Sequence, residues 1–227
     1  MLLTAYKRAI LLFDRLCFLV FARRFDVIGR ENAPAEGPLI VASNHLNNAD
    51  PPVLALAFSR FPVFMAKREM MSWPILGLGF RAFGAFPVSR GGADLSAIHA
   101  ATDIVNEGNM LVMFPEGTRS RTGGLTKGHP GTALIALRTG APILPAAITG
   151  TEQITWPWVF IKPFGIKHLT VTLGEPFTLE PVEKINSEAA TEATKLIMRK
   201  IAELLPPEYR GVYADTVEEA ANAPMQG

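Results

Sequence analysis

Short, uninterrupted apolar runs recur along this chain and alternate with segments of helical periodicity. The clearest runs are residues 38–42, 110–114 and 143–149. A strand that is apolar on both sides has to be covered on both faces, as the parallel strands of α/β proteins are. The alternation therefore predicts an α/β fold, a single domain with a mixed, mainly parallel central sheet flanked by helices.

Other segments extend this pattern. A helix is expected to begin near Asp50, whose carboxylate would cap it, and two prolines follow in its first turn. In sheets of this kind ligands bind beyond the carboxyl ends of the strands, so the polar residues that follow each strand are of most interest. Further strands are expected at residues 26–28, 62–66, 84–88 and 169–173, and further helices at 73–83, 94–107, 131–139 and 187–205.

The first 24 residues have a different character. The segment 2–22 is apolar but carries Asp14 and Arg15 in its middle, so it is too interrupted for a spanning helix, which needs roughly 20 apolar residues. On a helical wheel its charged side chains fall on one narrow face, which predicts an amphipathic helix lying in the membrane interface. A helix packed on the protein's own core is the alternative. The hydrophobic content of 48% favours membrane contact.

Composition restricts the partners and the compartment. The formal net charge of +1 provides no broad field for nucleic acid, so an anionic ligand must be held by a local cluster. The single cysteine, Cys17, excludes an internal disulfide and indicates a reducing compartment. We therefore expect a peripheral or monotopic protein on the cytoplasmic face of the cell membrane. Its expected parts are an interfacial helix at 1–24, an enzyme domain at 25–206 and a C-terminal tail at 207–227.

A histidine and an aspartate follow the apolar run 38–42. His45 leaves the predicted strand, and Asp50 stands five residues later, where the next helix begins. Across a tight turn Asp50 would accept a hydrogen bond from one imidazole nitrogen and leave the other as a base. No G-x-S-x-G nucleophile motif occurs in the chain, so the nucleophile is expected to be a hydroxyl of the substrate. The alternative is a capping aspartate beside a structural histidine.

A glycine and basic residues follow the run 110–114. The exposed N–H groups and cationic side chains of such a loop can hold a phosphate, and Glu116 could accept from a substrate hydroxyl. A solvated basic loop is the alternative. The residues of this cluster are Glu116, Gly117, Thr118 and Arg119, with Lys127 further along.

Arg90 follows the predicted strand 84–88 in the same way. In isolation it would be an ordinary surface arginine. Together the three clusters place a base, a hydrogen-bond acceptor and several cationic side chains at the ends of predicted strands. That combination indicates a site for an anionic substrate with a nucleophilic hydroxyl.

Four segments, taken in order, resemble the four sequence blocks of the glycerolipid acyltransferase family, which includes the 1-acylglycerol-3-phosphate acyltransferases. The resemblance runs from residue 39 to residue 150, about half of the 227 residues. The fourth segment reads Leu-Pro-Ala-Ala-Ile where the family often has Val-Pro-Val-Ala-Ile. The segments are Asn44-His45-x-x-x-x-Asp50, Gly84-x-Phe86-x-x-x-Arg90, Phe114-Pro115-Glu116-Gly117-Thr118-Arg119 and Ile143-Leu144-Pro145-Ala146-Ala147-Ile148.

The resemblance implies a reaction and roles for these residues. His45 and Asp50 would be the catalytic pair, and an acyl group would pass from acyl-CoA or acyl-carrier protein to 1-acylglycerol 3-phosphate, giving phosphatidic acid for phospholipid synthesis. No cofactor, metal or covalent acyl-enzyme is expected. Backbone N–H groups near the His45 turn could stabilise the oxyanion. The residues implied in binding the glycerol phosphate are Arg90, Glu116, Gly117 and Arg119, and Lys127 resembles the basic residue after the third block.

Several alternatives stay open. The acceptor could be another lysophospholipid, a lyso-aminolipid or glycerol 3-phosphate. The basic residues Arg90, Arg119, Arg121 and Lys127 favour a phosphate but do not separate a phosphomonoester from a diester. A hydrolase would use His45 to activate water. A metal enzyme would use His45, Asp50 and Glu116, although no H-E-x-x-H spacing occurs. From another class, the chain could be a non-catalytic lipid-binding membrane scaffold. The oligomeric state is not predicted.

Overall fold

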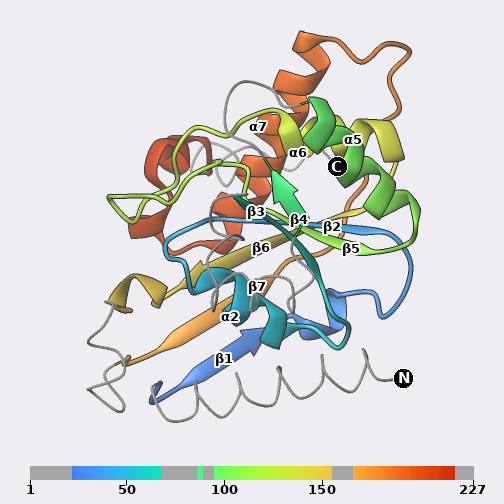
Figure 1. The fold of residues 1–227 in the computed structure, drawn as a ribbon. Helices are drawn as coiled ribbons and strands as arrows, with labels where there is room; N and C mark the ends of the chain where they lie inside the picture. The colour runs from blue at the N-terminus through green and yellow to red at the C-terminus, as the bar shows by residue number, and fades with distance from the viewer. Residues whose placement is uncertain (1–21, 68–85, 89–94, 155–165, 218–227) are drawn as a thin grey trace, which may run out of the picture.

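The computed structural model describes residues 22–67, 86–88, 95–154 and 166–217 of the chain (Figure 1). Residues 1–21 of the predicted N-terminal helix, the helix at 73–83 and Arg90 lie outside the described residues. Residues 22–24, which were included in that predicted helix, are described and are not helical. No helix within the described ranges has the length and apolar character needed to cross a membrane.

A single sheet of seven strands forms the centre of the domain, in the order β1-β7-β6-β2-β5-β3-β4. Neighbouring strands are parallel except for the antiparallel pair β6 and β7. The predicted α/β domain with a mixed, mainly parallel sheet is therefore confirmed. The strands are β1 (Phe25–Ile28), β2 (Leu39–Ser43), β3 (Val63–Lys67), β4 (Phe86–Val88), β5 (Met110–Met113), β6 (Ile143–Thr149) and β7 (Leu169–Leu173).

Helices cover both faces of the sheet, which explains the continuous apolar runs. Figure 1 shows α5, α6 and α7 together on one face and α2 on the other. The α-helices are α2 (Asp50–Ala57), α5 (Leu95–Asn106), α6 (Gly131–Thr139) and α7 (Ser187–Leu204), and the 3₁₀ helices are η1 (Arg30–Asn32), η2 (Thr151–Gln153), η4 (Pro207–Tyr209) and η5 (Gly211–Tyr213).

The central strand β2 contributes to two separate apolar clusters. All five of its residues are buried. Leu39 and Val41 pack in the cluster that includes α2, while Ile40 and Ala42 pack in the cluster formed with α5, α6 and α7. Burying a large aliphatic side chain is worth about 1.5–3 kcal/mol. This strand is therefore firmly held at the middle of the sheet, and the residues that follow it start from a fixed position.

The predicted elements agree closely with the structure where both can be compared. Strand and helix ends differ by at most one residue, and only the described part of the strand predicted at 84–88 can be compared. Asp50 does not cap α2 as expected. Ala49 occupies the N-cap position without a side-chain bond, and the Asp50 carboxylate turns back to the preceding turn instead.

The segment after α7 corrects the expectation of a tail that begins at 207. Residues 207–217 form η4, η5 and the start of a further helical turn. Val217 is 8% exposed, and Tyr209 and Tyr213 pack against the same cluster as α7. The aromatic side chains supply apolar area that the polar composition of the last residues does not suggest, so this part of the chain belongs to the domain.

Candidate active site

The parallel register of β2 and β5 brings two of the predicted clusters together. Ala42 pairs with Met113, so residues three positions further along each strand leave the sheet side by side. Those residues are His45 and Glu116, and the His45 N–H donates to Glu116 Oε1 at 3.0 Å. The site therefore lies at the carboxyl edge of the sheet, as expected for this fold.

His45 and Asp50 form a hydrogen-bonded pair. The Nδ1 of His45 lies 2.7 Å from Asp50 Oδ2, and the side chains are 17% and 0% exposed. An ionised carboxylate only accepts hydrogen bonds, so the proton of the neutral imidazole is on Nδ1. The Nε2 atom has no partner among the described residues and is left as the acceptor, which is the state a general base requires.

Backbone donors fix the Asp50 carboxylate. Its Oδ2 also accepts from the N–H groups of Leu46 at 2.6 Å and Asn47 at 2.8 Å. Three hydrogen bonds to one oxygen close the turn that joins β2 to α2. Because the carboxylate cannot rotate without breaking all three bonds, it sets the orientation of the imidazole as well as its tautomer.

Phe114 holds the ring of His45 from another direction. The two rings stack with centroids 4.1 Å apart and planes inclined by 19°. Phe114 directly follows β5 and is the first residue of the third sequence segment named above. Nothing in the sequence indicated that its ring contacts His45. We assign it a role in positioning the base.

Asn44 ties the end of β2 to β6. Its amide nitrogen donates to the Ile148 carbonyl at 2.9 Å, and its amide oxygen accepts from the Ile148 N–H at 2.7 Å. The side chain is 1% exposed and takes the place of a backbone peptide in the ladder. This clamp fixes the residue immediately before His45, and sequence reasoning assigned it no role.

Glu116 faces the protein rather than an open space. The residue is 1% exposed, and its Oε2 accepts from the Thr126 N–H at 2.8 Å and the Thr126 hydroxyl at 2.7 Å. With Oε1 occupied by His45, both oxygens have protein donors. The expectation that Glu116 accepts from a substrate hydroxyl is therefore not what this geometry supports, and we assign it the role of joining the His45 turn to the loop around Thr126.

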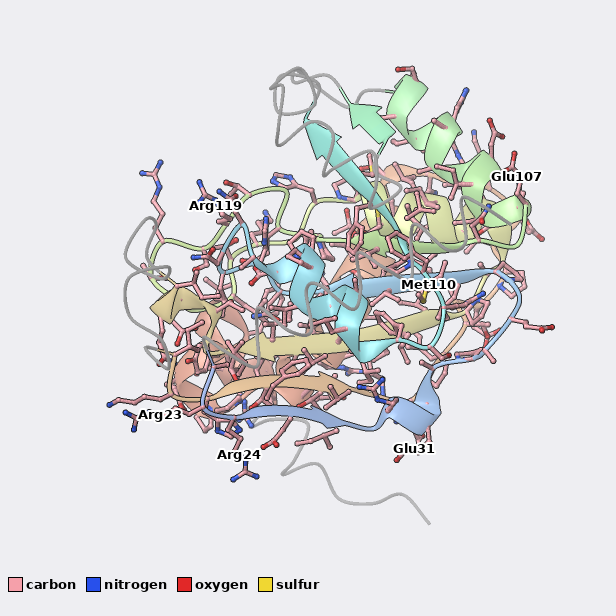
Figure 2. The ribbon with its side chains drawn as sticks, turned by 60° about the horizontal axis from the view of Figure 1, so that its bottom comes forward. Arg23, Arg24, Glu31, Glu107, Met110 and Arg119 are labelled. Carbon is pink, nitrogen blue, oxygen red and sulfur yellow. The ribbon has the colours of Figure 1, made fainter. Side chains whose placement is uncertain are left out.

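The basic loop begins next to His45. The Ser120 N–H donates to the His45 carbonyl at 2.7 Å, which places Arg119 beside the turn. Gly117 has φ of 66°, and a Cβ there would lie 3.1 Å from the His129 ring, so a side chain would be strained and crowded. Figure 2 shows Arg119 at the side of the molecule opposite Glu107, which precedes β5. The exposed side chains of this loop include those of Thr118, Arg119, Arg121, Thr122, Lys127 and His129.

Three N–H groups of the His45 turn, those of His45, Leu46 and Asn47, are already used within the protein. That of His45 bonds Glu116, and those of Leu46 and Asn47 bond Asp50. These three N–H groups are therefore not the expected oxyanion donors. Across the described ranges, no group of three or more His, Cys, Asp or Glu residues is arranged to hold a metal ion.

Comparisons with known proteins give the family of the chain. The model of the Acyltransferase family matches residues 24–149, which include His45, Asp50 and the basic loop. A 1-acyl-sn-glycerol-3-phosphate acyltransferase of Bacillus subtilis (strain 168) is 30% identical over 180 residues, which is 78% of this chain and 86% of that protein.

Two further relatives are matched over a smaller part of their length. A 1-acyl-sn-glycerol-3-phosphate acyltransferase of Borreliella burgdorferi is 31% identical over 56% of this chain, and the chloroplastic BAT2 enzyme of Brassica napus is 30% identical over 57%. The matched parts span only 52% and 38% of those proteins.

A solved structure has the same fold. The crystal structure of the 1-acyl-sn-glycerophosphate (LPA) acyltransferase PlsC from Thermotoga maritima superposes with a TM-score of 0.66 and 26% sequence identity. The superposition covers 87% of this chain and 79% of that one.

Proposed function

The chain belongs to the acyltransferase family, and on this premise we propose that it transfers a fatty acyl group from a thioester to the free hydroxyl of 1-acylglycerol 3-phosphate, giving phosphatidic acid. The observation that carries the proposal is the pair of the partly buried His45 and the buried Asp50 beside an exposed basic loop. A base that is oriented by a carboxylate serves to remove a proton, and the neighbouring cations suit a phosphate.

The proposed reaction is a direct transfer. Nε2 of His45 takes the proton of the acceptor hydroxyl while the hydroxyl oxygen forms a bond to the thioester carbonyl carbon. The tetrahedral intermediate then collapses, the carbon–sulfur bond breaks, and the leaving thiolate takes the proton from the imidazolium. Asp50 remains ionised throughout and stabilises the imidazolium that forms between the two steps.

The acceptor phosphate would be bound by the loop that follows β5. Arg119 and Lys127 are exposed on this loop, and Arg119 immediately precedes the residue that bonds the His45 carbonyl. A guanidinium can bind two phosphate oxygens at once, which would fix the glycerol hydroxyl relative to His45. Gly117 and Thr118 would add backbone and hydroxyl donors, and Arg90 is proposed as a further ligand on the strength of the family resemblance.

Both acyl-CoA and acyl-carrier protein remain proposed donors. Both present the same thioester to the base and differ only in what the leaving thiol is attached to. Comparing turnover with the two donors at equal acyl chain length would decide which of them is used.

We propose that the protein works at the cytoplasmic face of the cell membrane. The support is the amphipathic pattern of its first residues and the long acyl chain of the proposed acceptor. Removal of residues 1–21 tests this, because Ala22 already pairs with Ile166 in the fold and should be kept. Loss of sedimentation with phospholipid vesicles is expected, and unchanged sedimentation would count against the proposal.

The first experiment follows thiol release from acyl-CoA by the purified chain in mild detergent. Release should require 1-acylglycerol 3-phosphate and should produce phosphatidic acid, with a His45→Ala variant as the inactive control. Release without acceptor would indicate a thioesterase and overturn the proposal. Transfer to another lysophospholipid, but not to this one, would keep the reaction class and change the acceptor.

A further inference from the structure

The loop that carries Lys127 is held from two sides by distant parts of the chain. On one side Thr126 bonds the buried carboxylate of Glu116. On the other side the segment after α7 runs along the loop. The loop therefore connects the C-terminal segment to the turn of His45.

Backbone hydrogen bonds join the C-terminal segment to the loop. The Leu125 N–H donates to the Tyr209 carbonyl at 2.9 Å, and the Val212 N–H donates to the Leu125 carbonyl at 3.1 Å. The two backbones approach so closely at Gly211, where φ is 51°, that a Cβ there would collide with the Leu125 carbonyl oxygen. Leu125 itself is 2% exposed, which anchors this part of the loop in the core.

A side chain completes the contact. The hydroxyl of Tyr213 accepts from the Gly128 N–H at 3.2 Å. A Cβ on Gly128 would lie 2.6 Å from Met198 Cγ in α7, so the backbone is pressed against that helix. Both neighbours of Lys127 in the sequence, Thr126 and Gly128, are therefore held by hydrogen bonds.

The same loop continues the connection to the base. The Thr126 hydroxyl and N–H donate to Glu116 Oε2, and Glu116 Oε1 accepts from the His45 N–H. A path of hydrogen bonds therefore runs from residues 209–213 through the loop to the backbone of His45. A hydrogen bond to a buried carboxylate is among the stronger contacts of a protein, so each link can transmit a displacement.

We propose that Tyr213 and Thr126 are positioning residues for the reaction inferred above, on which this inference rests. Tyr213 fixes the position of Lys127 and thereby the site that binds the acceptor. Thr126 fixes the Glu116 carboxylate and thereby the backbone of His45, the base. The side chain of Tyr213 is then a functional part of the site and acts without touching the substrate.

The two roles predict changes in different kinetic constants, kcat for Thr126 and the acceptor KM for Tyr213. A Thr126→Val variant keeps the shape of the side chain but loses the hydroxyl donor, and its kcat should fall about tenfold while the KM for the lysophosphatidic acceptor changes little. Thr126→Ser restores the donor and should restore most of kcat. A Tyr213→Phe variant should instead raise the acceptor KM roughly threefold or more while kcat changes less.

Tyr209→Phe is the matched control. It removes a hydroxyl from the same segment, but that hydroxyl donates to Glu152 at 2.9 Å rather than to the loop. Its kinetic constants should stay close to those of the unmodified chain. Equal effects of Tyr209→Phe and Tyr213→Phe, or failure of Thr126→Ser to restore kcat, would overturn the proposal, because the segment would then act through stability alone.

Hydrogen–deuterium exchange tests the same path without relying on activity. In Tyr213→Phe the amides of Gly128 and Thr126 should exchange faster while amides of α7 keep their protection, and Tyr209→Phe should show neither change. If the unmodified chain transfers no acyl group, the proposed function fails and the exchange result still decides whether the path exists. Unchanged exchange at Gly128 and Thr126 would overturn the positioning role.

Discussion

Two histidine–aspartate pairs among the described residues have the same separation and very different surroundings. His45 Nδ1 lies 2.7 Å from Asp50 Oδ2, and His168 Nε2 lies 2.7 Å from Asp26 Oδ2. The first pair stands at the carboxyl edge of the sheet, where β2 ends. The second links β1 to the residue just before β7, at the edge of the sheet.

Burial and further partners distinguish the pairs. Asp50 is fully buried and accepts two backbone N–H groups, and His45 stacks on Phe114. The side chains of His168 and Asp26 are 46% and 30% exposed. The bond from His168 lowers the pKa of Asp26, and Arg24, 2.7 Å away, lowers it further.

The choice of nitrogen also differs. His45 uses Nδ1 for its aspartate, and its Nε2 has no partner in the described part of the chain. His168 instead uses Nε2, which also lies 3.3 Å from the Thr170 hydroxyl. A short His–Asp distance therefore does not identify a catalytic base. What distinguishes the pair of His45 is a carboxylate fixed by backbone donors, a ring held on its face and an Nε2 without a partner among the described residues, next to the basic loop.

The largest expected effect separates the two histidines directly. His45→Ala should lower the turnover of acyl transfer by about 10²–10⁴-fold, the usual contribution of a general base, while the fold is retained. His168→Ala should leave turnover almost unchanged. Initial rates of both variants with acyl-CoA and 1-acylglycerol 3-phosphate measure this, and equal losses would remove the distinction between the pairs.

Exchange of each aspartate for asparagine sharpens the comparison. Asp50→Asn should lower turnover by as much as about 10⁴-fold, because an amide no longer stabilises the imidazolium and can favour the wrong tautomer. It should also destabilise the turn, since an amide oxygen accepts the Leu46 and Asn47 N–H groups less strongly than a carboxylate does. The matched Asp26→Asn variant should keep its activity, so rates and unfolding curves for both variants test the assignment.

The stacking contact is expected to have a moderate effect. Phe114→Leu removes the ring that lies on His45 and should lower kcat by roughly 2- to 10-fold, from the about 0.5–1.5 kcal/mol that aromatic pairs contribute. Phe114→Tyr keeps the ring and should retain more activity than Phe114→Leu. If Phe114→Leu alters thermal stability without altering kcat, the ring serves packing only.

The smallest effect concerns pH and the exposed pair. The pKa of Asp26 in the folded chain lies below the ordinary value of 3.8, so its ionised form stabilises the fold above that pH. This contribution is lost as the pH falls through the lowered pKa. Unfolding by urea across the acid range should therefore show Asp26→Asn less stable than the unmodified chain near neutral pH and equal to it in strong acid. Solvent and salt screen this pair, so added salt should shrink the difference.

Much of the fold followed from local patterns. Continuous apolar runs predicted the covered strands, and periodic segments predicted α5, α6 and α7 with ends within one residue of those observed. His45 and Asp50 were also recognisable, because only a short turn separates them. Polar residues that follow a buried strand lie at the carboxyl edge of the sheet. The proximity of His45 and Asp50 could therefore be expected without a structure.

Roles that depend on distant residues were missed or misjudged. Glu116 was expected to contact the substrate, yet its carboxylate joins His45, 71 residues earlier, to Thr126. Asn44 is bonded to Ile148, 104 residues later, and Tyr213 to Gly128, 85 residues earlier. Nothing in the neighbourhood of these residues in the sequence indicates their partners.

The sequence by itself determined the secondary structure, the α/β class and the turn that pairs His45 with Asp50, because these depend on residues within a few positions of one another. Only the tertiary structure decided which groups surround that pair. The alignment of Ala42 with Met113 sets His45 beside Glu116, and the return of the chain after α7 sets Tyr213 beside the basic loop. Strand order and register come from packing whole layers against each other, and that packing is a property of the entire chain.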